Sequence, residues 1–167
     1  MNIGIGLKSR TVGAALATLT LAGFAPGAQA TETEYGGTFC MTSKPTVLES
    51  NADVTTLIYE GWGIQTPNST FKPWENATMR CVGYMRIMGG KPTAKGSCRW
   101  VDSAGDSFTG EYEDTPDMPG KWIFLAGTGK WKGITGSGTY KTVSYGKPAA
   151  PGTSQLCREH SGKYILP

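Results

Sequence analysis

The chain has 167 residues, with 16 Lys and Arg against 13 Asp and Glu, for a net charge of +3. Two of the basic residues lie in a leader that we expect to be removed, which leaves basic and acidic side chains almost balanced. A nearly neutral chain gives no electrostatic reason to expect binding to nucleic acid or to an anionic membrane. The length is suited to a single domain.

The first thirty residues have the pattern of a secretory signal peptide. A short basic region precedes a small, apolar run from Val12 to Phe24, and the Ala-Gln-Ala sequence at 28–30 fits a cleavage site. A membrane anchor is the alternative, but the apolar run is too short and too rich in Ala and Gly. We therefore expect cleavage of residues 1–30, export to the periplasm or the medium, no membrane insertion afterwards, and one domain over residues 31–167.

Beyond the leader, short β-rich runs alternate with turn residues, and no helical period persists over three turns. Loops are predicted over Thr42–Asp53, Thr66–Glu75 and Gly146–Gly152. The count of strands is about eight, the number whose closed barrel holds side chains or one small ligand. The expected fold is an all-β, antiparallel up-and-down barrel tied by disulfides. The predicted strands are Tyr35–Met41, Val54–Gln65, Ala77–Met88, Lys95–Val101, Ser107–Glu113, Trp122–Leu125, Thr139–Val143 and His160–Leu166.

All four cysteines follow the predicted leader. An even number of cysteines in an exported chain predicts two disulfides. Zinc is the alternative, but no cysteine pair has the close spacing of a zinc site, and His160 is the only histidine. We therefore expect no metal and no cofactor.

The Gly-Gly dipeptide at 89–90 suits a two-residue hairpin turn, which would fix the register of the strands on either side. In that register Cys81 faces Cys98 at a non-hydrogen-bonded pair, where side chains approach most closely. Arg80 then faces Arg99, a like-charge cost. A longer loop through Pro92 would shift this register. The predicted disulfides are Cys81–Cys98 and Cys40–Cys157, the second tying the first strand to the last region.

A glycine-rich stretch runs from Gly127 to Tyr140 between two β-prone segments, with Trp122 just before it and Trp131 inside it. Glycine allows close backbone approach and positive φ, so the cluster indicates a tight corner between two strands. The stretch lacks the spacing of a phosphate-binding loop and is followed by strand character rather than a helix.

Residues 98–106 (CRWVDSAGD) and 127–138 (GTGKWKGITGSG) resemble small bacterial proteins of the allene oxide cyclase-like barrel class, which is related in fold to plant allene oxide cyclases and dirigent proteins. The resemblance covers residues 96–143 well and the rest by strand order. It implies a calycin-like barrel with an apolar cavity, a role in steering cyclisation or coupling of reactive apolar or phenolic intermediates, and assembly into homo-oligomers. The catalytic carboxylates and arginines of these relatives are not carried over, because they do not align residue by residue.

Three polar residues on two neighbouring strands are candidates for catalysis. Glu60 sits in an otherwise apolar strand, and a carboxyl inside an apolar barrel would have a raised pKa and serve as acid or base. Arg80 and Tyr84 share one face of the next strand with Arg86, where they would orient an oxyanion or carboxylate. The alternative places all of them on a solvated outer face.

Other polar residues carry weaker signals. Asp102 and Asp106 flank a Ser-Ala-Gly turn, and aspartates there commonly cap the turn through its backbone. A calcium site, with too few ligands, and a general acid at the barrel mouth are the functional alternatives. His160 has no visible catalytic partner, so a structural or exposed position is favoured.

The aromatic residues suit a ligand pocket and a dry core equally well. The leading hypothesis is an exported barrel that binds a small apolar or phenolic molecule and directs its isomerisation, cyclisation or coupling by confinement. As an enzyme it would be isomerase-, cyclase- or lyase-like. The alternative is a non-catalytic ligand carrier or a protein-interaction module. The predicted ligand-binding residues are Tyr59, Trp62, Trp100, Tyr112, Trp122 and Phe124.

Overall fold

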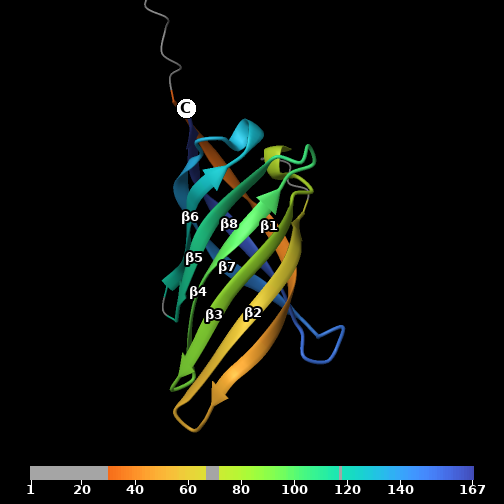
Figure 1. Ribbon diagram of the computed structural model, residues 1–167, viewed down its shortest axis with the longest axis vertical. Coiled ribbons are helices and arrows are strands. Elements are labelled where there is room, and N and C mark those ends of the chain that lie inside the picture. Colours follow the sequence, from red (N-terminus) through yellow and green to blue (C-terminus); the bar gives the residue numbers. More distant parts are fainter. Residues whose placement is uncertain (1–29, 67–71, 117) are drawn as a thin grey trace, which may run out of the picture.

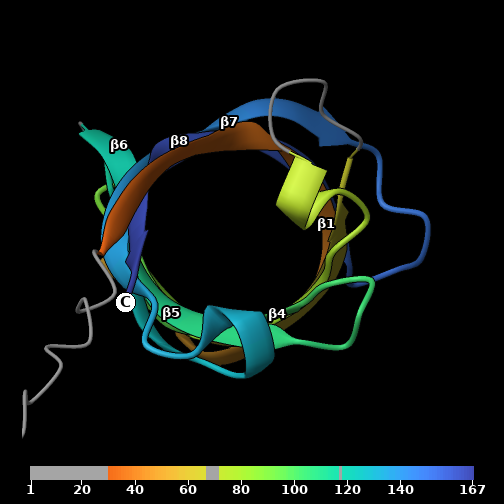
Figure 2. The ribbon, with the colours of Figure 1, turned by 90° about the horizontal axis from the view of Figure 1, so that it is seen from above.

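The computed structural model describes residues 30–66, 72–116 and 118–167, so all but the last residue of the predicted leader lies outside the described residues. The strands form one closed antiparallel barrel, in which each strand pairs with its neighbours in sequence and β1 pairs with β8 (Figures 1 and 2). This confirms the predicted all-β, eight-stranded fold. The elements are β1 (Thr31–Ser50), β2 (Val54–Gln65), the short 3₁₀ turn η1 (Lys72–Trp74), β3 (Thr78–Met88), β4 (Lys91–Val101), β5 (Ser107–Thr115), β6 (Met118–Gly127), the 3₁₀ turn η2 (Gly129–Trp131), β7 (Thr135–Gly146) and β8 (Ser154–Leu166).

β1 is much longer than predicted, and the expected loop over Thr42–Asp53 is wrong. The strand continues to Ser50, with Pro45 opposite Tyr59 of β2. Pairing of β1 with β8 ends at Ser43, so the part that contains Pro45 has a hydrogen-bonded neighbour on one side only. Proline lacks the N–H of a ladder and is tolerated where one edge of a strand is unpaired.

The hairpin of β3 and β4 has the predicted register. Cys81 lies opposite Cys98, and Arg80 lies opposite Arg99. The two guanidinium groups have different partners, since Arg80 pairs with Glu60 whereas Arg99 donates to Ser107 Oγ at 3.2 Å. Both predicted disulfides, Cys81–Cys98 and Cys40–Cys157, are formed.

The glycine-rich stretch forms the predicted corner, in which η2 joins β6 to β7. Gly129 has a φ of +52°, and a Cβ atom there would collide with the carboxylate of Asp106. Asp106 in turn accepts a hydrogen bond from the Lys130 backbone N–H at 3.1 Å. Glycine is therefore required at this position both by its backbone conformation and by the close approach of the neighbouring turn.

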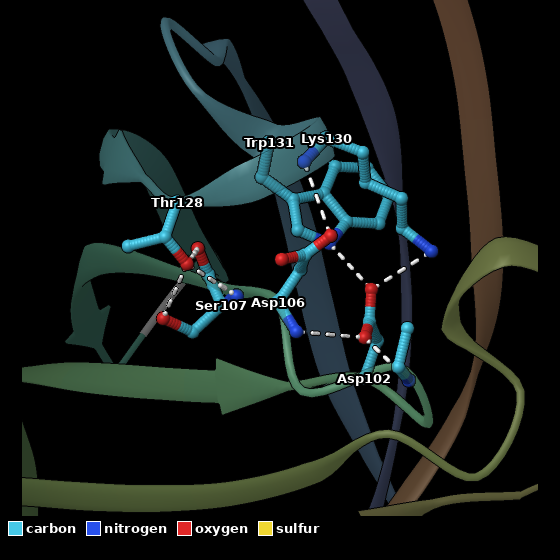
Figure 3. A network of polar contacts seen from close by, with 7 residues as sticks. Asp102, Asp106, Ser107, Thr128, Lys130 and Trp131 are labelled. Atoms are coloured by element: carbon cyan, nitrogen blue, oxygen red, sulfur yellow. Dashed lines mark hydrogen bonds and ion pairs between the residues drawn. The ribbon is translucent and has the colours of Figure 1, made fainter.

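The same corner is fastened to the β4–β5 turn through Asp102 (Figure 3). One carboxylate oxygen caps the turn by accepting from the backbone N–H groups of Ala104 and Asp106, at 2.9 and 3.1 Å. The other accepts from Trp131 Nε1 and Lys130 Nζ, both at 2.8 Å. Burial alone would raise the pKa of Asp102, but the hydrogen bonds from Lys130, Trp131 and Ala104 outweigh it and hold the pKa below its usual value. The turn-capping role predicted for Asp102 is confirmed.

Both 3₁₀ turns lie at the same end of the barrel, on its rim (Figures 1 and 2). They insert Trp74 and Trp131 into a cluster of rings that fills this end, for example with Trp74 and Phe108 centroids 4.9 Å apart. We call this region the aromatic end. It comprises Trp74, Trp100, Phe108, Trp131 and Tyr164.

Among the described residues, no helix has the length and apolar character needed to cross a bilayer, and no group of three or more His, Cys, Asp or Glu side chains is placed to hold a metal ion.

Candidate functional site: a cavity inside the barrel

Below the aromatic end the barrel is hollow, with a cavity of about 360 Å³. The cavity extends from Trp74 and Trp100 towards the opposite end of the barrel, where Pro45, Leu57 and Tyr145 line it. Its wall is mostly apolar, and its volume falls within the range of small-molecule sites, about 300–1,000 Å³. We call this region the hollow half. Apolar and sulfur-containing residues around it include Phe39, Met41, Met79, Cys81, Met85, Cys98 and Leu156.

Two tyrosines meet across the cavity because the wall behind them is made of glycine. Tyr59 of β2 and Tyr112 of β5 share a hydrogen bond of 2.6 Å between their hydroxyl groups. The Tyr112 hydroxyl lies over Gly83 and Gly96 on β3 and β4, where an added Cβ atom would collide with it. These two glycines therefore create the space in which the phenol ring crosses from β5 towards β2.

An ion pair lies beside this tyrosine pair. Arg158 of β8 donates from Nη2 to Asp114 Oδ2 of β5 at 3.0 Å, and both side chains are mostly buried. The guanidinium carbon lies 4.7 Å from the ring centroid of Tyr140, a cation–π arrangement. Burial alone would lower the pKa of Arg158, but Asp114, together with Tyr140 and Tyr59, outweighs it and raises that pKa. Because the guanidinium group is paired with a carboxylate, the ion pair adds no net charge to the cavity wall.

Three tyrosines and the histidine of the cavity wall are neutral. Burial is the main cause that raises the pKa of Tyr59, Tyr112 and Tyr140 above the usual value of 10, so their hydroxyl groups keep their protons. Burial also lowers the pKa of His160 to about 4, so its imidazole is uncharged at neutral pH. The interior thus offers neutral hydrogen-bonding groups on an aromatic wall, which suits binding and orientation of an uncharged molecule.

Four of the predicted ligand-binding residues, Tyr59, Trp100, Tyr112 and Trp122, do line the cavity. Phe124 is buried in the adjoining ring cluster, 5.8 Å from Trp122 between ring centroids. Trp62 is 47% exposed, so its expected position in the pocket is wrong. Since Tyr59 points inward and side chains alternate along a strand, Trp62 points outward.

Glu60, Arg80 and Tyr84 lie on the outer face, and their expected position inside the barrel is wrong. Glu60 follows the inward-pointing Tyr59, and its carboxylate pairs with Arg80 on the surface. Tyr84 is 41% exposed. The solvated outer face weighed as the alternative describes all three, because Met79 and Cys81 take the inward positions of β3.

The sequence interpretation missed Arg158, which lines the cavity, and its ion-pair partner Asp114. The predicted last strand began at His160, whereas β8 begins at Ser154. Extending the alternation backwards from the inward-pointing His160 would have placed Arg158 inside the barrel. The predicted fifth strand ended at Glu113, whereas β5 continues to Thr115 and places Asp114 opposite Ala94 of β4.

Comparison with known proteins gives a fold relationship. No protein-family model matches the chain, and no curated protein sequence matches it. Among solved structures, the barrel is similar to that of a pterocarpan synthase dirigent protein, with a TM-score of 0.52 at 11% sequence identity. The match covers 86% of this chain and 99% of the other. The protein therefore has the fold of a dirigent-like β-barrel.

Proposed function

We propose that the protein is an exported barrel that binds a small apolar or phenolic molecule in its cavity and directs the isomerisation, cyclisation or coupling of that molecule. The observation that carries the proposal is the cavity of about 360 Å³, whose apolar wall is interrupted by a few convergent polar groups. The fold supports it, since the dirigent protein with a similar barrel is a pterocarpan synthase. Two disulfides support export.

The cavity residues suit steering by confinement rather than nucleophilic catalysis. All four cysteines are in disulfides, and burial keeps the hydroxyl groups of Tyr59, Tyr112 and Tyr140 protonated and the His160 imidazole uncharged near neutral pH. In this proposal Tyr59, Tyr112 and Arg158, which all line the cavity, hydrogen-bond to and polarise an oxygen atom of the bound molecule. The aromatic walls then hold the rest of that molecule in one orientation, which selects among its possible ring closures or couplings.

The test is to fill the cavity from one strand and compare with a change on the opposite face of that strand. Leu57 lines the cavity, whereas its neighbour Ile58 is 46% exposed on the outer face. With p-phenylphenol as the probe and isothermal titration calorimetry as the measurement, Leu57→Trp should weaken binding at least tenfold and Ile58→Trp should leave it unchanged. Equal binding by all three proteins, or no binding by the wild type, contradicts a ligand-binding cavity.

A carrier is the second candidate, supported by the neutral groups of the cavity wall: burial raises the pKa of Tyr59, Tyr112 and Tyr140 and lowers the pKa of His160, so none of these four side chains exchanges a proton near neutral pH. Native mass spectrometry of protein purified from its own host would identify a molecule lost on denaturation. Incubation of that molecule with the protein then separates the two functions: a carrier returns it unchanged, whereas an enzyme converts it to an isomer or a coupled product.

A further inference from the structure

His160 occupies a box of aromatic rings at the deep end of the cavity. Its imidazole is stacked on Trp100, with an interplanar angle of 11° and centroids 6.1 Å apart, and its edges meet Tyr35 and Phe39. The side chain lines the cavity while the residue is only 9% exposed. A phenylalanine would pack at least as well in this box, so packing alone does not explain the two nitrogen atoms of the imidazole.

The imidazole lacks a hydrogen bond that its burial demands. Its Nε2 atom is buried and has no partner among the described residues. A buried polar atom without a partner destabilises a fold, and such atoms in native proteins commonly meet a water or a ligand. Because burial keeps the ring neutral, one nitrogen can donate and the other can accept a hydrogen bond.

A second polar position lies two residues earlier on the same strand and also points inward. The Nε atom of Arg158 is buried without a hydrogen-bond partner among the described residues, although Nη2 is paired with Asp114. Alternate residues of a strand are roughly 7 Å apart, and aromatic rings line the space beside both. Since Asp114 already neutralises Arg158, an anionic ligand gains no unpaired positive charge here.

We propose that His160 is the deep anchor for the cavity's ligand, an uncharged and largely aromatic molecule with two hydrogen-bonding oxygens, one held by His160 and the other beside Arg158. The inference rests on the proposed function, because it requires that the cavity bind a small molecule. It adds the class of that molecule and a residue that selects it. A site that hydrogen-bonds a ligand oxygen discriminates against the analogue that lacks it, since the buried partner is then left unpaired.

The experiment compares two rigid probes that differ in one oxygen, p,p′-biphenol and p-phenylphenol, by calorimetric titration. The wild-type protein should bind the biphenol about tenfold more tightly, the scale of one buried hydrogen bond. His160→Phe keeps an aromatic ring in the stack but removes both nitrogens, and should abolish this preference while p-phenylphenol still binds. Tyr164→Phe is the matched control, because it removes a polar atom from the inner face of the same strand in a residue that does not line the cavity. It should retain the preference.

A measurement on the wild type keeps the proposal falsifiable if His160→Phe fails to fold. His160 is the only histidine, so ring ¹⁵N signals of protein made without a polyhistidine tag report on this side chain alone. They should shift on saturation with p,p′-biphenol. Binding without a shift, or an unchanged preference in His160→Phe, overturns the role of His160. Tighter binding when one hydroxyl of the biphenol is replaced by a carboxylate overturns the uncharged class, and failure of every probe to bind counts against the proposed function itself.

Discussion

At the aromatic end Trp74, Phe108 and Trp131 are at most 2% exposed and pack ring against ring, whereas in the hollow half Met41, Tyr59 and Trp122 line open space. Empty volume removes packing contacts and so weakens the hollow half. That half is the one reinforced by covalent links: Cys81–Cys98 lies in the cavity wall, and Cys40–Cys157 adjoins the wall residues Met41 and Leu156. Tight packing and ligand space are therefore divided between the two ends of one barrel.

Removing a disulfide from the hollow half should have the largest effect. Cys40–Cys157 spans 117 residues of sequence, and replacing both cysteines by serine should lower the free energy of unfolding by about 4–5 kcal/mol. The same change at Cys81–Cys98, which spans 17 residues, should cost about 3 kcal/mol. Urea unfolding measures both. If neither variant loses stability, the covalent links do not compensate for the cavity.

Truncating a tryptophan should distinguish the two ends directly. Trp131→Ala removes a side chain that is 1% exposed and bonded to Asp102, so it should cost about 4 kcal/mol. Trp122→Ala enlarges a space that is already open and should cost less than about 2 kcal/mol. Midpoints of chemical denaturation give the comparison. Equal losses would mean that the hollow half is packed as tightly as the aromatic end.

The imidazole of His160 lies where the two regions meet and should make stability depend on pH. Its pKa of about 4 in the folded protein lies below the usual value of 6.5, so the unfolded chain takes up a proton that the folded one does not. The contribution of the neutral imidazole to the free energy of unfolding is therefore fully present above pH 6.5. It decreases as the pH is lowered towards 4, by about 3 kcal/mol in total. Unfolding curves between these values should show the slope, and His160→Phe should reduce it. An NMR titration of the ring near 6.5 in the native state would contradict it.

The sequence was informative where a short-range rule leaves one solution. A two-residue Gly-Gly hairpin allows one register, and that register placed Cys81 opposite Cys98. The alternation of side chains along a strand also predicts that Tyr59 and Trp62 lie on opposite faces of β2, unless a bulge intervenes. The position expected for Trp62 ignored this rule. The pairing of Arg158 with Asp114 could not be predicted from the sequence, because it joins β8 to β5 across the barrel and depends on the bounds of both strands.

From the pairing of β1 we expect the barrel to close late in folding. Its N-terminal part, from Thr31, pairs with the last strand, where Thr31 faces Leu166, while its C-terminal part pairs with β2. The other seams join strands adjacent in sequence and form as hairpins, but this seam brings together the two ends of the domain and requires the loss of entropy of the longest loop. Until it closes, β1 and β8 are open edges, which are templates for association with other chains. The disulfide between Cys40 and Cys157 links β1 to β8 covalently, so we expect it to limit aggregation as well as unfolding.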